Sequence, residues 1–245
     1  MKKSLPITVR QLLARLCFGG KSTRNRRRQQ VASRWLTGHG IEIGALHNPL
    51  VVSVKSKVTY VDRMDVAGLR RHYPELAKDS LLSVDIIDDG ELLAKFPDES
   101  QDFIIANHFL EHCENPIGVI AAWLRVLRPG GIAFAAVPDK RFTFDYARPA
   151  TTWQHILRDW SEGSLWSRKE HYREWAELVE STSPREVNAR VQELMNTSYS
   201  IHFHVWTSQT LREFVHRCET ELSLPFTICE FVRNGLETIV VFKKI

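Results

Sequence analysis

From residue 40 onward, the sequence alternates between short apolar runs and longer stretches in which apolar residues recur every three or four positions. The short runs predict five strands: GIEIGAL (40–46), KVTYVD (57–62), LLSVDII (81–87), DFIIANH (102–108) and IAFAAVP (132–138). Helices are predicted between them at 66–77 and 116–127, and RPGG at 128–131 ends the second helix. Strands and helices that alternate in this way predict a parallel sheet with helices on both faces.

Beyond residue 147 the pattern changes to helices alone. Three stretches rich in Trp, His and charged residues follow one another: TTWQHILRDW (151–160), RKEHYREWAELVE (168–180) and PREVNARVQELM (184–195). Their apolar positions recur at helical spacing, and no strand pattern interrupts them. We therefore expect a helical cap, inserted over residues 147–197.

The alternating pattern resumes after the insertion but ends in a different way. SQTLREFVHRCETEL (208–222) predicts a helix with Ser208 as its N-cap. FTICEFVR (226–233) and LETIVVFKKI (236–245) predict two strands joined at Asn234-Gly235, a dipeptide typical of hairpins. A mainly parallel sheet should therefore close with an antiparallel hairpin.

The composition fits one globular domain with an insertion, because the chain has 245 residues, of which 43% are hydrophobic and 25% charged. We divide it into an N-terminal extension (1–38), a core (39–146 and 198–245) and the cap (147–197). The four cysteines are scattered without a CxxC pair, which favours a reducing, cytoplasmic compartment. No apolar run reaches the length of a membrane span.

Basic residues concentrate at the N-terminus. The first 41 residues contain ten Lys or Arg and no acid, so the remaining chain holds 23 basic and 29 acidic residues. Between Ser4 and Gly20, apolar residues fall on one helical face, which predicts a helix that packs on the domain or lies on an anionic membrane surface. In the second case the protein is peripheral to the inner face of a membrane. Residues 21–30 predict the solvated start of a basic helix, and without interleaved aromatics they do not indicate nucleic-acid binding.

The loop after the first strand indicates a cofactor with a ribose. IEIGALHNPL (41–50) has one glycine, Gly44, which lets a ligand approach the backbone closely. The further glycines of a dinucleotide loop are missing, which disfavours NAD and FAD. Asp62 follows about twenty residues later, where a carboxylate can accept both ribose hydroxyls. From these residues alone the cofactor stays open.

Four successive motifs carry a resemblance to a known family: IEIGA, YVDRMD, FPDESQDFIIANHFLEHCENP and RVLRPGGIAFAAVP. Together they resemble class I S-adenosylmethionine-dependent methyltransferases of the type 11-like kind. The match covers roughly residues 39–140, and the terminal hairpin corresponds to the last two strands of that family. The resemblance implies an α/β fold: a doubly wound, Rossmann-like, mainly parallel seven-stranded sheet that ends in an antiparallel hairpin.

The same resemblance implies S-adenosyl-L-methionine as the cofactor and a set of residues around it. Glu42, Gly44 and Ala45 would lie at its methionine end. Asp62 would bind the ribose, with Arg63 beside the adenine. The remaining matches are Asp85 and Ile86 at the adenine edge, with Asp88 as a further candidate there, and Asn107 and His108 near the methyl group.

The segment HFLEH supplies candidates for a base close to the transferable methyl group. His108, Glu111 and His112 fall within about one helical turn. The cluster is similar to the one that binds a divalent metal in ubiquinone-type O-methyltransferases, with His108 in place of a carboxylate. Three roles stay open: ordering of the cofactor loop, general base catalysis, and a metal that acidifies a hydroxyl.

The segment IHFHVW (201–206) is a second candidate constellation. As a strand it would place His202, His204 and Trp206 on one face, where two imidazoles can ligate a metal or flank a substrate. His171 and Tyr172 of the cap could join them in an acceptor pocket. The alternative is that these histidines and aromatics are hydrogen-bonded parts of the core of the cap.

The segment VPDKRFTFD leaves the fifth strand at the edge where ligands bind. Asp139 could act as a base, and Lys140 and Arg141 could hold an anionic acceptor. A salt-bridged turn is the alternative. We expect His112, Asp139 and His204 to be the polar groups nearest the acceptor, with His108, His171 and His202 behind them.

These residues, with VPDKRFTFD and HFHVWT resembling bacterial polysaccharide-modifying methyltransferases, predict an enzyme that O-methylates a sugar or polysaccharide terminus. The alternatives are a methyltransferase for a small metabolite such as a quinone or natural product, and a regulatory protein that binds the cofactor without turnover. A nicotinamide dehydrogenase is disfavoured by the missing glycines and by the hairpin.

Overall fold

The computed structural model describes residues 21–73, 76 and 78–245. A seven-stranded sheet in the order β3-β2-β1-β4-β5-β7-β6 lies at its centre. All neighbours from β3 to β5 are parallel, and β7 is antiparallel to both β5 and β6. The strands are β1 (Gly38–Ile43), β2 (Ser56–Asp62), β3 (Ile86–Ile87), β4 (Gln101–Asn107), β5 (Leu127–Pro138), β6 (Phe226–Asn234) and β7 (Glu237–Lys244). This topology confirms the expected Rossmann-like methyltransferase fold with its antiparallel end.

The strand order reverses between β1 and β4. The chain runs outward from β1 through β2 to β3, returns to β4 beside β1, and then continues to β5. In such sheets, ligands bind outside the carboxyl ends of the strands at this reversal. β1 and β4 also approach closely, because a Cβ on Gly40 would lie 2.3 Å from the ring and the carbonyl oxygen of Phe103. The topology therefore fixes where the site must be sought.

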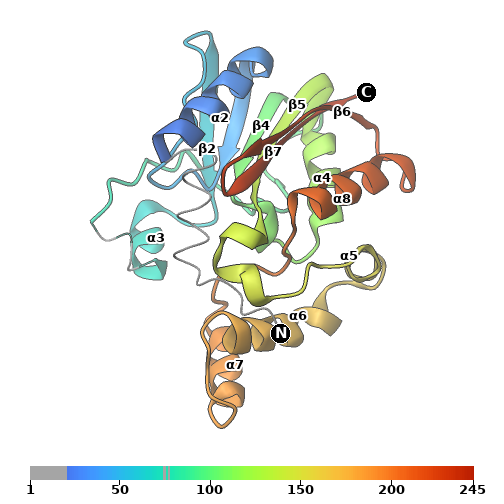
Figure 1. Cartoon of the computed structure of the whole chain (residues 1–245). Coiled ribbons are helices and arrows are strands. Elements are labelled where there is room, and N and C mark those ends of the chain that lie inside the picture. The colour runs from blue at the N-terminus through green and yellow to red at the C-terminus, as the bar shows by residue number, and fades with distance from the viewer. Residues whose placement is uncertain (1–20, 74–75, 77) are drawn as a thin grey trace.

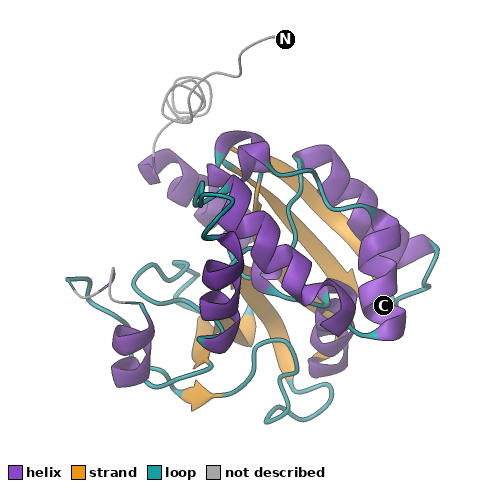
Figure 2. Cartoon of the chain, turned by 90° about the horizontal axis from the view of Figure 1, so that it is seen from below, coloured by secondary structure: helices purple, strands orange, loops and turns teal. Residues whose placement is uncertain are grey.

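Helices cover both faces of the sheet (Figures 1 and 2). α2 (Lys21–Trp35) packs on one face through Val31 and Ala32, and α4 (Pro116–Val126) and α8 (Ser208–Thr220) pack on the other. α3 (Val66–His72) follows β2. In β4 the apolar residues alternate between these two cores, with Phe103 and Ile105 facing α2. A strand that is buried on both faces must be apolar throughout, which is what the continuous run at 102–108 indicated.

The cap consists of α5 (Trp153–Glu162), α6 (Leu165–Leu178) and α7 (Val187–Asn196), as the sequence predicts (Figure 1). α5 contributes Ile156 to the core beneath α4 and α8. α6 and α7 instead form a separate apolar cluster, to which Trp175 and Leu194 belong and which the segment 201–206 joins through Ile201 and Phe203. The cap is therefore anchored to the sheet by α5 and to the segment before α8 by α6.

Two local predictions near α8 are wrong. Residues 201–205 lie outside the strands and helices, and only Trp206 forms an isolated bridge, with Asp139. No strand pairs with this segment in the described sheet, so its side chains are not sorted onto two faces. The N-cap of α8 is Thr207 rather than Ser208, because Thr207 and Thr210 form a reciprocal capping box.

Two predicted elements are shorter than the sequence pattern suggests. The third strand was expected at 81–87, but β3 contains only Ile86 and Ile87. The helix expected at 66–77 ends at His72. The predicted amphipathic helix before Gly20 lies outside the described residues. Among the described helices, none has both the length and the apolar character needed to cross a membrane.

The basic helix α2 is not solvated all round, contrary to the prediction. Arg28 is buried and donates through Nε and Nη2 to the carboxylate of Glu237, at 2.7 and 2.5 Å. Asn234 donates to the same group at 2.7 Å. Burial opposes ionisation of Glu237, yet the bonds from His108 and Arg28 prevail and lower its pKa to about 2. One carboxylate thus joins α2, the hairpin and the loop after β4.

We expect the substitution Arg28→Leu to lower the free energy of unfolding by about 3 kcal/mol, because it leaves the Glu237 carboxylate buried with less compensation. Chemical denaturation followed by circular dichroism measures the change. Arg27→Leu, at an exposed position of the same helix, should change the value by less than about 0.5 kcal/mol. Equal effects of the two substitutions would contradict the role of this ion pair.

Candidate active site

A cavity of about 810 Å³ lies at the carboxyl edge of the sheet. Its walls come from the segments that follow β1, β2, β3 and β4, from the turn after β5, and from α6 and the segment 199–202. The volume falls in the range of small-molecule and cofactor sites. The cavity is therefore where the topology places a ligand, and its roof is the inserted cap.

Gly44 and Asp62 line the cavity beside β1 and β2. Gly44 has a φ of +65°, and a Cβ built on it would meet nothing within 4 Å, so the backbone is open to the cavity. Asp62 accepts a hydrogen bond from the Arg63 N–H at 2.8 Å. Burial raises the pKa of Asp62, which the contact with Arg63 only partly opposes. A partly desolvated carboxylate in this place is a strong acceptor for hydroxyl groups.

Arg63 also lines the cavity, and its side chain is held by α3 and the residue after it. Its Nη2 lies 2.5 Å from Nε2 of His72 and donates to the hydroxyl of Tyr73 at 2.9 Å. Ala45, although next to Gly44, is not among the lining residues. Of the residues predicted for the methionine end, the ribose and the adenine, Gly44, Asp62 and Arg63 therefore line the cavity, one for each part of the cofactor.

Glu42 and Asn107 lie beneath the cavity rather than on its wall. The Glu42 carboxylate accepts from the Leu50 N–H at 3.0 Å and from Nδ2 of Asn107 at 3.3 Å. Burial raises the pKa of Glu42 from 4.5 to about 7, against these two hydrogen bonds and the more distant Arg28. Glu42 thus orders residues 45–50 from below, which shapes the loop that contains Gly44.

The acidic residues that line the cavity lie a few positions later in the chain than the predicted Asp85 and Ile86. Asp85 accepts from the Tyr60 N–H at 2.8 Å and, like Ile86, does not line the cavity. The lining residues are instead the last residue of β3 and those that follow it: Ile87, Asp88, Asp89, Gly90 and Glu91. Burial, together with Asp89 and Glu114, raises the pKa of Glu91 to about 7. Because β3 is only two residues long, the sequence pattern gave no register for this segment.

His108 turns the chain at the end of β4 with a φ of +54° and lines the cavity. Its Nε2 lies 2.9 Å from Oε2 of Glu237, the buried carboxylate that Arg28 also binds. Its other ring nitrogen, Nδ1, lies 3.5 Å from Oε1 of Glu111, and the side chain is about 43% exposed. His108 is therefore fixed from the hairpin side, which no local pattern in HFLEH indicates.

His112 and His202 face each other on the cavity wall, with ring centroids 4.7 Å apart. Nδ1 of His112 lies 2.9 Å from the carbonyl oxygen of Ile201, and Nδ1 of His202 lies 2.7 Å from Oδ2 of Asp145. Because these oxygens can only accept, both histidines carry their proton on Nδ1 in the neutral form. The Nε2 atom of each ring then has a free lone pair.

Burial and the neighbouring His202 lower the pKa of His112 to about 3, so this ring is neutral at neutral pH. Glu111 is buried beside them, and both of its carboxylate oxygens have no hydrogen-bond partner. Burial raises its pKa to about 7, although His202 opposes the shift. Glu111, His112 and His202 each offer a ligand atom within 4.8 Å of the others, so they could hold a metal ion. The arrangement is compatible with all three roles predicted for HFLEH: ordering of the loop, general base catalysis and metal binding.

Asp145 is the residue that the sequence analysis missed. It is buried in the turn after β5, where its second oxygen, Oδ1, accepts from Arg148 at 2.9 Å. Burial disfavours the charged carboxylate, but His202 and Arg148 prevail and lower its pKa. The motif VPDKRFTFD contained the signal, but the sequence gave more weight to Asp139 because it lies directly at the strand end.

An aromatic wall forms the remaining side of the cavity. Phe144 packs edge-on against Trp175 at 5.3 Å between ring centroids and lies 4.8 Å from the ring of His202. Tyr199 and Ser200 complete this side. Tyr172, which was predicted to bind substrate, is buried in the cap and donates to the carbonyl of Tyr199 at 3.1 Å. Tyr172 thus supports the wall from behind.

Asp139, Lys140 and Arg141 form a salt-bridged turn away from the cavity. The Asp139 carboxylate is buried, binds Nε of Arg141 at 2.9 Å and accepts from the Ser208 N–H at 3.0 Å. Nζ of Lys140 donates to the carbonyl of Tyr146 at 3.0 Å. The turn links β5 to the start of α8, and these contacts support the structural alternative for all three residues.

His204, His171 and Trp206 are also outside the cavity wall. Trp206 is buried in the core beneath α8. His204 and His171 lie behind the wall, next to His155 and Asp159, and burial lowers the pKa of both to about 3. The structure therefore brings His108, His112 and His202 to the cavity, while Asp139, His171 and His204 lie deeper. His112 and His171 lie as expected, and the other four residues have exchanged places.

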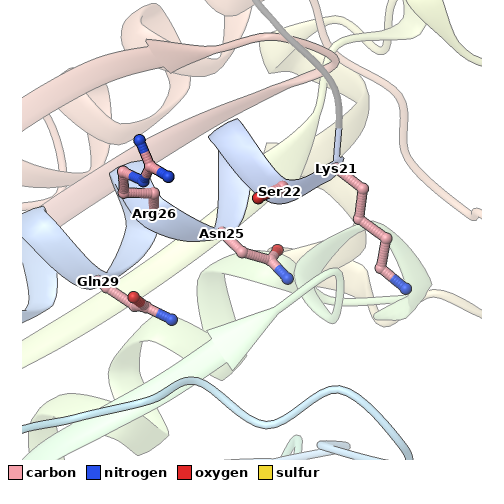
Figure 3. A pocket seen from close by; sticks show the side chains of 5 residues that line it. All are labelled: Lys21, Ser22, Asn25, Arg26 and Gln29. Atoms are coloured by element: carbon pink, nitrogen blue, oxygen red, sulfur yellow. The ribbon is translucent and has the colours of Figure 1, made fainter.

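A second hollow, of about 430 Å³, lies over the first turns of α2 (Figure 3). The side chains around it are those of Lys21, Ser22, Asn25, Arg26 and Gln29. Among the described residues, those around the hollow all belong to this one helix, and we assign the hollow no ligand.

Residues 38–135 match the sequence model of the methyltransferase domain family. No curated protein matches the chain. The chain is similar to a solved S-adenosylmethionine-dependent methyltransferase from Aquifex aeolicus, with 12% identity, a TM-score of 0.48, and coverage of 99% of this chain and 100% of the other. A Rhodobacter sphaeroides protein named for zinc-dependent alcohol dehydrogenases matches with 14% identity, a TM-score of 0.53, and coverage of 96% and 98%. Likenesses this distant concern the fold alone.

We expect Asp62→Ala to weaken the binding of S-adenosylhomocysteine about 10- to 100-fold, because charge-assisted bonds to ribose hydroxyls contribute about 1.5–3 kcal/mol. Isothermal titration calorimetry measures the affinity. Glu213→Ala, at an exposed position on α8, serves as the control and should leave the affinity unchanged. A tight complex with the Asp62 variant would exclude a ribose contact at this carboxylate.

A pH-dependent contribution to stability is expected from Glu42. Its pKa is about 7 in the folded protein against 4.5 ordinarily, so the folded state holds the extra proton and loses stability as the pH rises between these values. The substitution Glu42→Gln removes this loss. Its stability relative to the wild type should therefore increase by about 2 kcal/mol between pH 5 and pH 8, measured by urea denaturation. A difference that does not change with pH, as expected for Glu213→Gln, would refute the assignment.

Proposed function

We propose that this chain, whose residues 38–135 match the methyltransferase domain family, uses S-adenosylmethionine to methylate a hydroxyl group of a sugar or polysaccharide terminus. The observation that carries the proposal is the hydrogen bond between the buried Asp145 and His202, because His202 lines the same cavity as Gly44 and Asp62. A hydroxyl acceptor must lose a proton during transfer, and a carboxylate-oriented imidazole is a suitable group to take it.

The cavity residues fit the cofactor. Gly44 leaves open the space that a side chain would fill, so an amino-acid moiety can approach the backbone there. Asp62 offers a carboxylate for two ribose hydroxyls, and Arg63 flanks the same end. When bound, S-adenosylmethionine supplies an electrophilic methyl group on a sulfonium. The part of the chain that holds it is the β1–β2–β3 edge, which leaves the His202 side for the acceptor.

His202 is the proposed general base. Asp145 fixes the ring through Nδ1, so Nε2 is the atom that can accept the hydroxyl proton. The resulting imidazolium would be stabilised by the adjacent carboxylate. His112, whose Nε2 is also unprotonated, accepts a hydrogen bond from a neighbouring hydroxyl and positions it. General-base assistance of this kind contributes about 10²- to 10⁴-fold to rate.

The acceptor side combines aromatic faces with small polar groups. Phe144, Trp175 and Tyr199 offer ring surfaces, and Ser200 adds a hydroxyl. Aromatic faces stack on the apolar faces of sugar rings, while the polar groups bind hydroxyls, and this mixture supports a sugar rather than an apolar quinone. The basic N-terminal segment would suit an acceptor that is attached to a membrane-bound assembly.

An acceptor screen tests the proposal. The purified chain is incubated with S-adenosyl[methyl-³H]methionine and either a panel of mono- and oligosaccharides or a panel of phenols and quinols, and the labelled products are counted. We expect label in saccharides. Label only in phenols or quinols would replace the proposal with a small-metabolite methyltransferase. Cofactor binding without any labelled product would favour a regulatory protein.

The substitution His202→Asn should lower kcat by about 10²- to 10⁴-fold, because the amide still donates to Asp145 but has no basic nitrogen. The affinity for S-adenosylhomocysteine should change less than twofold, since the cofactor side of the cavity is untouched. Stopped-time methylation assays and calorimetry measure the two quantities. His216→Asn, at an exposed histidine of α8, is the matched control. A His202 variant with more than half the wild-type kcat would rule out this base.

A further inference from the structure

Three histidines and one aspartate gather in the cap, outside the cavity described above. His155 and Asp159 lie one turn apart on α5, His171 lies on α6, and His204 belongs to the segment before α8. Each side chain offers one nitrogen or carboxylate oxygen, and these four atoms all lie within 4.8 Å of one another. Asp159, His171 and His204 are buried. Three separate segments thus converge on one point.

The distances between these atoms match a metal site. Nε2 of His155 lies 3.0 Å from Nε2 of His171 and 3.3 Å from Oδ2 of Asp159, and Nε2 of His204 lies 3.6 Å from the same oxygen. In a tetrahedral zinc site with bonds of about 2.0–2.1 Å, neighbouring ligand atoms are about 3.4 Å apart. These three distances are close to that value, and the remaining pairs lie within 4.8 Å, so a metal at the centre would draw the four side chains together.

The hydrogen bonding of the cluster is incomplete without a ligand. Oδ2 of Asp159 is buried and has no hydrogen-bond partner. Nε2 of His204 lies 3.2 Å from the carbonyl oxygen of Glu114, a contact that a metal ion would replace. The other oxygen of Asp159, Oδ1, is held by Ser167 Oγ at 2.7 Å, which fixes the carboxylate with Oδ2 toward the histidines. An unpartnered buried carboxylate oxygen is costly, and a cation removes that cost. Ser167 corresponds to the outer-shell partner that ligating carboxylates commonly have.

We propose that His155, Asp159, His171 and His204 bind one Zn²⁺ ion in a closed, tetrahedral, structural site. Three imidazoles and one carboxylate are ligands typical of zinc, whereas Mg²⁺ and Ca²⁺ require six or more oxygens. All four positions come from the protein, so no position remains for a substrate or a catalytic water. The ion would hold α5 and α6 against the segment 201–206.

The zinc site would also position the cavity residue His202, whatever the acceptor is. His204 is two residues from His202, and the backbone of Phe203 and His204 donates to the carbonyl oxygen of Glu111 at 2.7 and 3.2 Å. Fixing His204 therefore fixes the segment that carries His202 to the cavity wall. The ion acts as a positioning element, and its loss should loosen the roof of the cavity without removing any group that touches a ligand.

Metal analysis of the full-length chain tests the proposal. The protein is stripped with a chelator, dialysed against ZnCl₂, freed of unbound metal by gel filtration, and analysed by mass spectrometry of the metal. We expect one zinc per chain, and a tetrahedral Co²⁺ absorption spectrum when CoCl₂ replaces ZnCl₂. A chain that retains no zinc, or a Co²⁺ spectrum typical of octahedral coordination, would overturn the proposal.

Variants identify the ligands. Asp159→Asn and His171→Ala should abolish stoichiometric zinc, and Ser167→Ala should weaken the affinity about 10- to 100-fold. His216→Ala, at an exposed histidine of α8, should bind like the wild type. Wild-type zinc content in the Asp159 and His171 variants would show surface binding and refute the site.

A further measurement does not depend on the folding of the variants. The stripped wild-type chain is heated with and without ZnCl₂, and the melting temperature should rise with zinc concentration, because the ion binds the folded state only. His216→Ala should show the same rise. An unchanged melting temperature would contradict a structural ion. This result does not depend on whether the chain is a methyltransferase.

Discussion

The guanidinium of Arg148 is the buried charge on which the roof of the cavity depends. It is only 1% exposed and binds Asp145 at 2.9 Å, Glu174 of α6 at 2.6 Å, and the carbonyl oxygens of His202 and Phe203 at 2.7 and 3.3 Å. It thereby joins the turn after β5, the cap and the segment before α8. A buried charge of this kind needs all of its partners, since loss of one leaves the rest uncompensated.

This arrangement explains why two histidines two residues apart have different environments. The segment 201–206 does not form a strand of the sheet. Its backbone is held by hydrogen bonds to Arg148 and to the carbonyl oxygen of Glu111 instead of by a ladder of strand hydrogen bonds. His202 meets Asp145 on the cavity wall, whereas His204 meets Asp159 and the histidines of the cap. The proposed base and the proposed zinc site therefore share one short segment, and each constrains the other.

The parts of the site that the sequence predicted well are those next to a strand end. Asp62 is the last residue of β2, and Gly44, Arg63 and His108 directly follow β1, β2 and β4; all four line the cavity. Asp85 and Ile86 were misplaced by a few residues, because β3 has only two residues and offers no periodicity. Glu42 is close to the site but acts from below, through Leu50, a contact that spans a loop.

The sequence by itself determined most of the strands, the hairpin, the three cap helices and the edge of the sheet at which the cavity lies, because apolar periodicity and glycine positions act over a few residues. Only the tertiary structure decided which polar side chains meet. Asp145 lies 57 residues from His202, Arg28 lies 209 from Glu237, and the zinc ligands come from three segments. Such pairs depend on how the cap and the helices pack on the sheet, and this packing cannot be predicted from the spacing of residues along the chain.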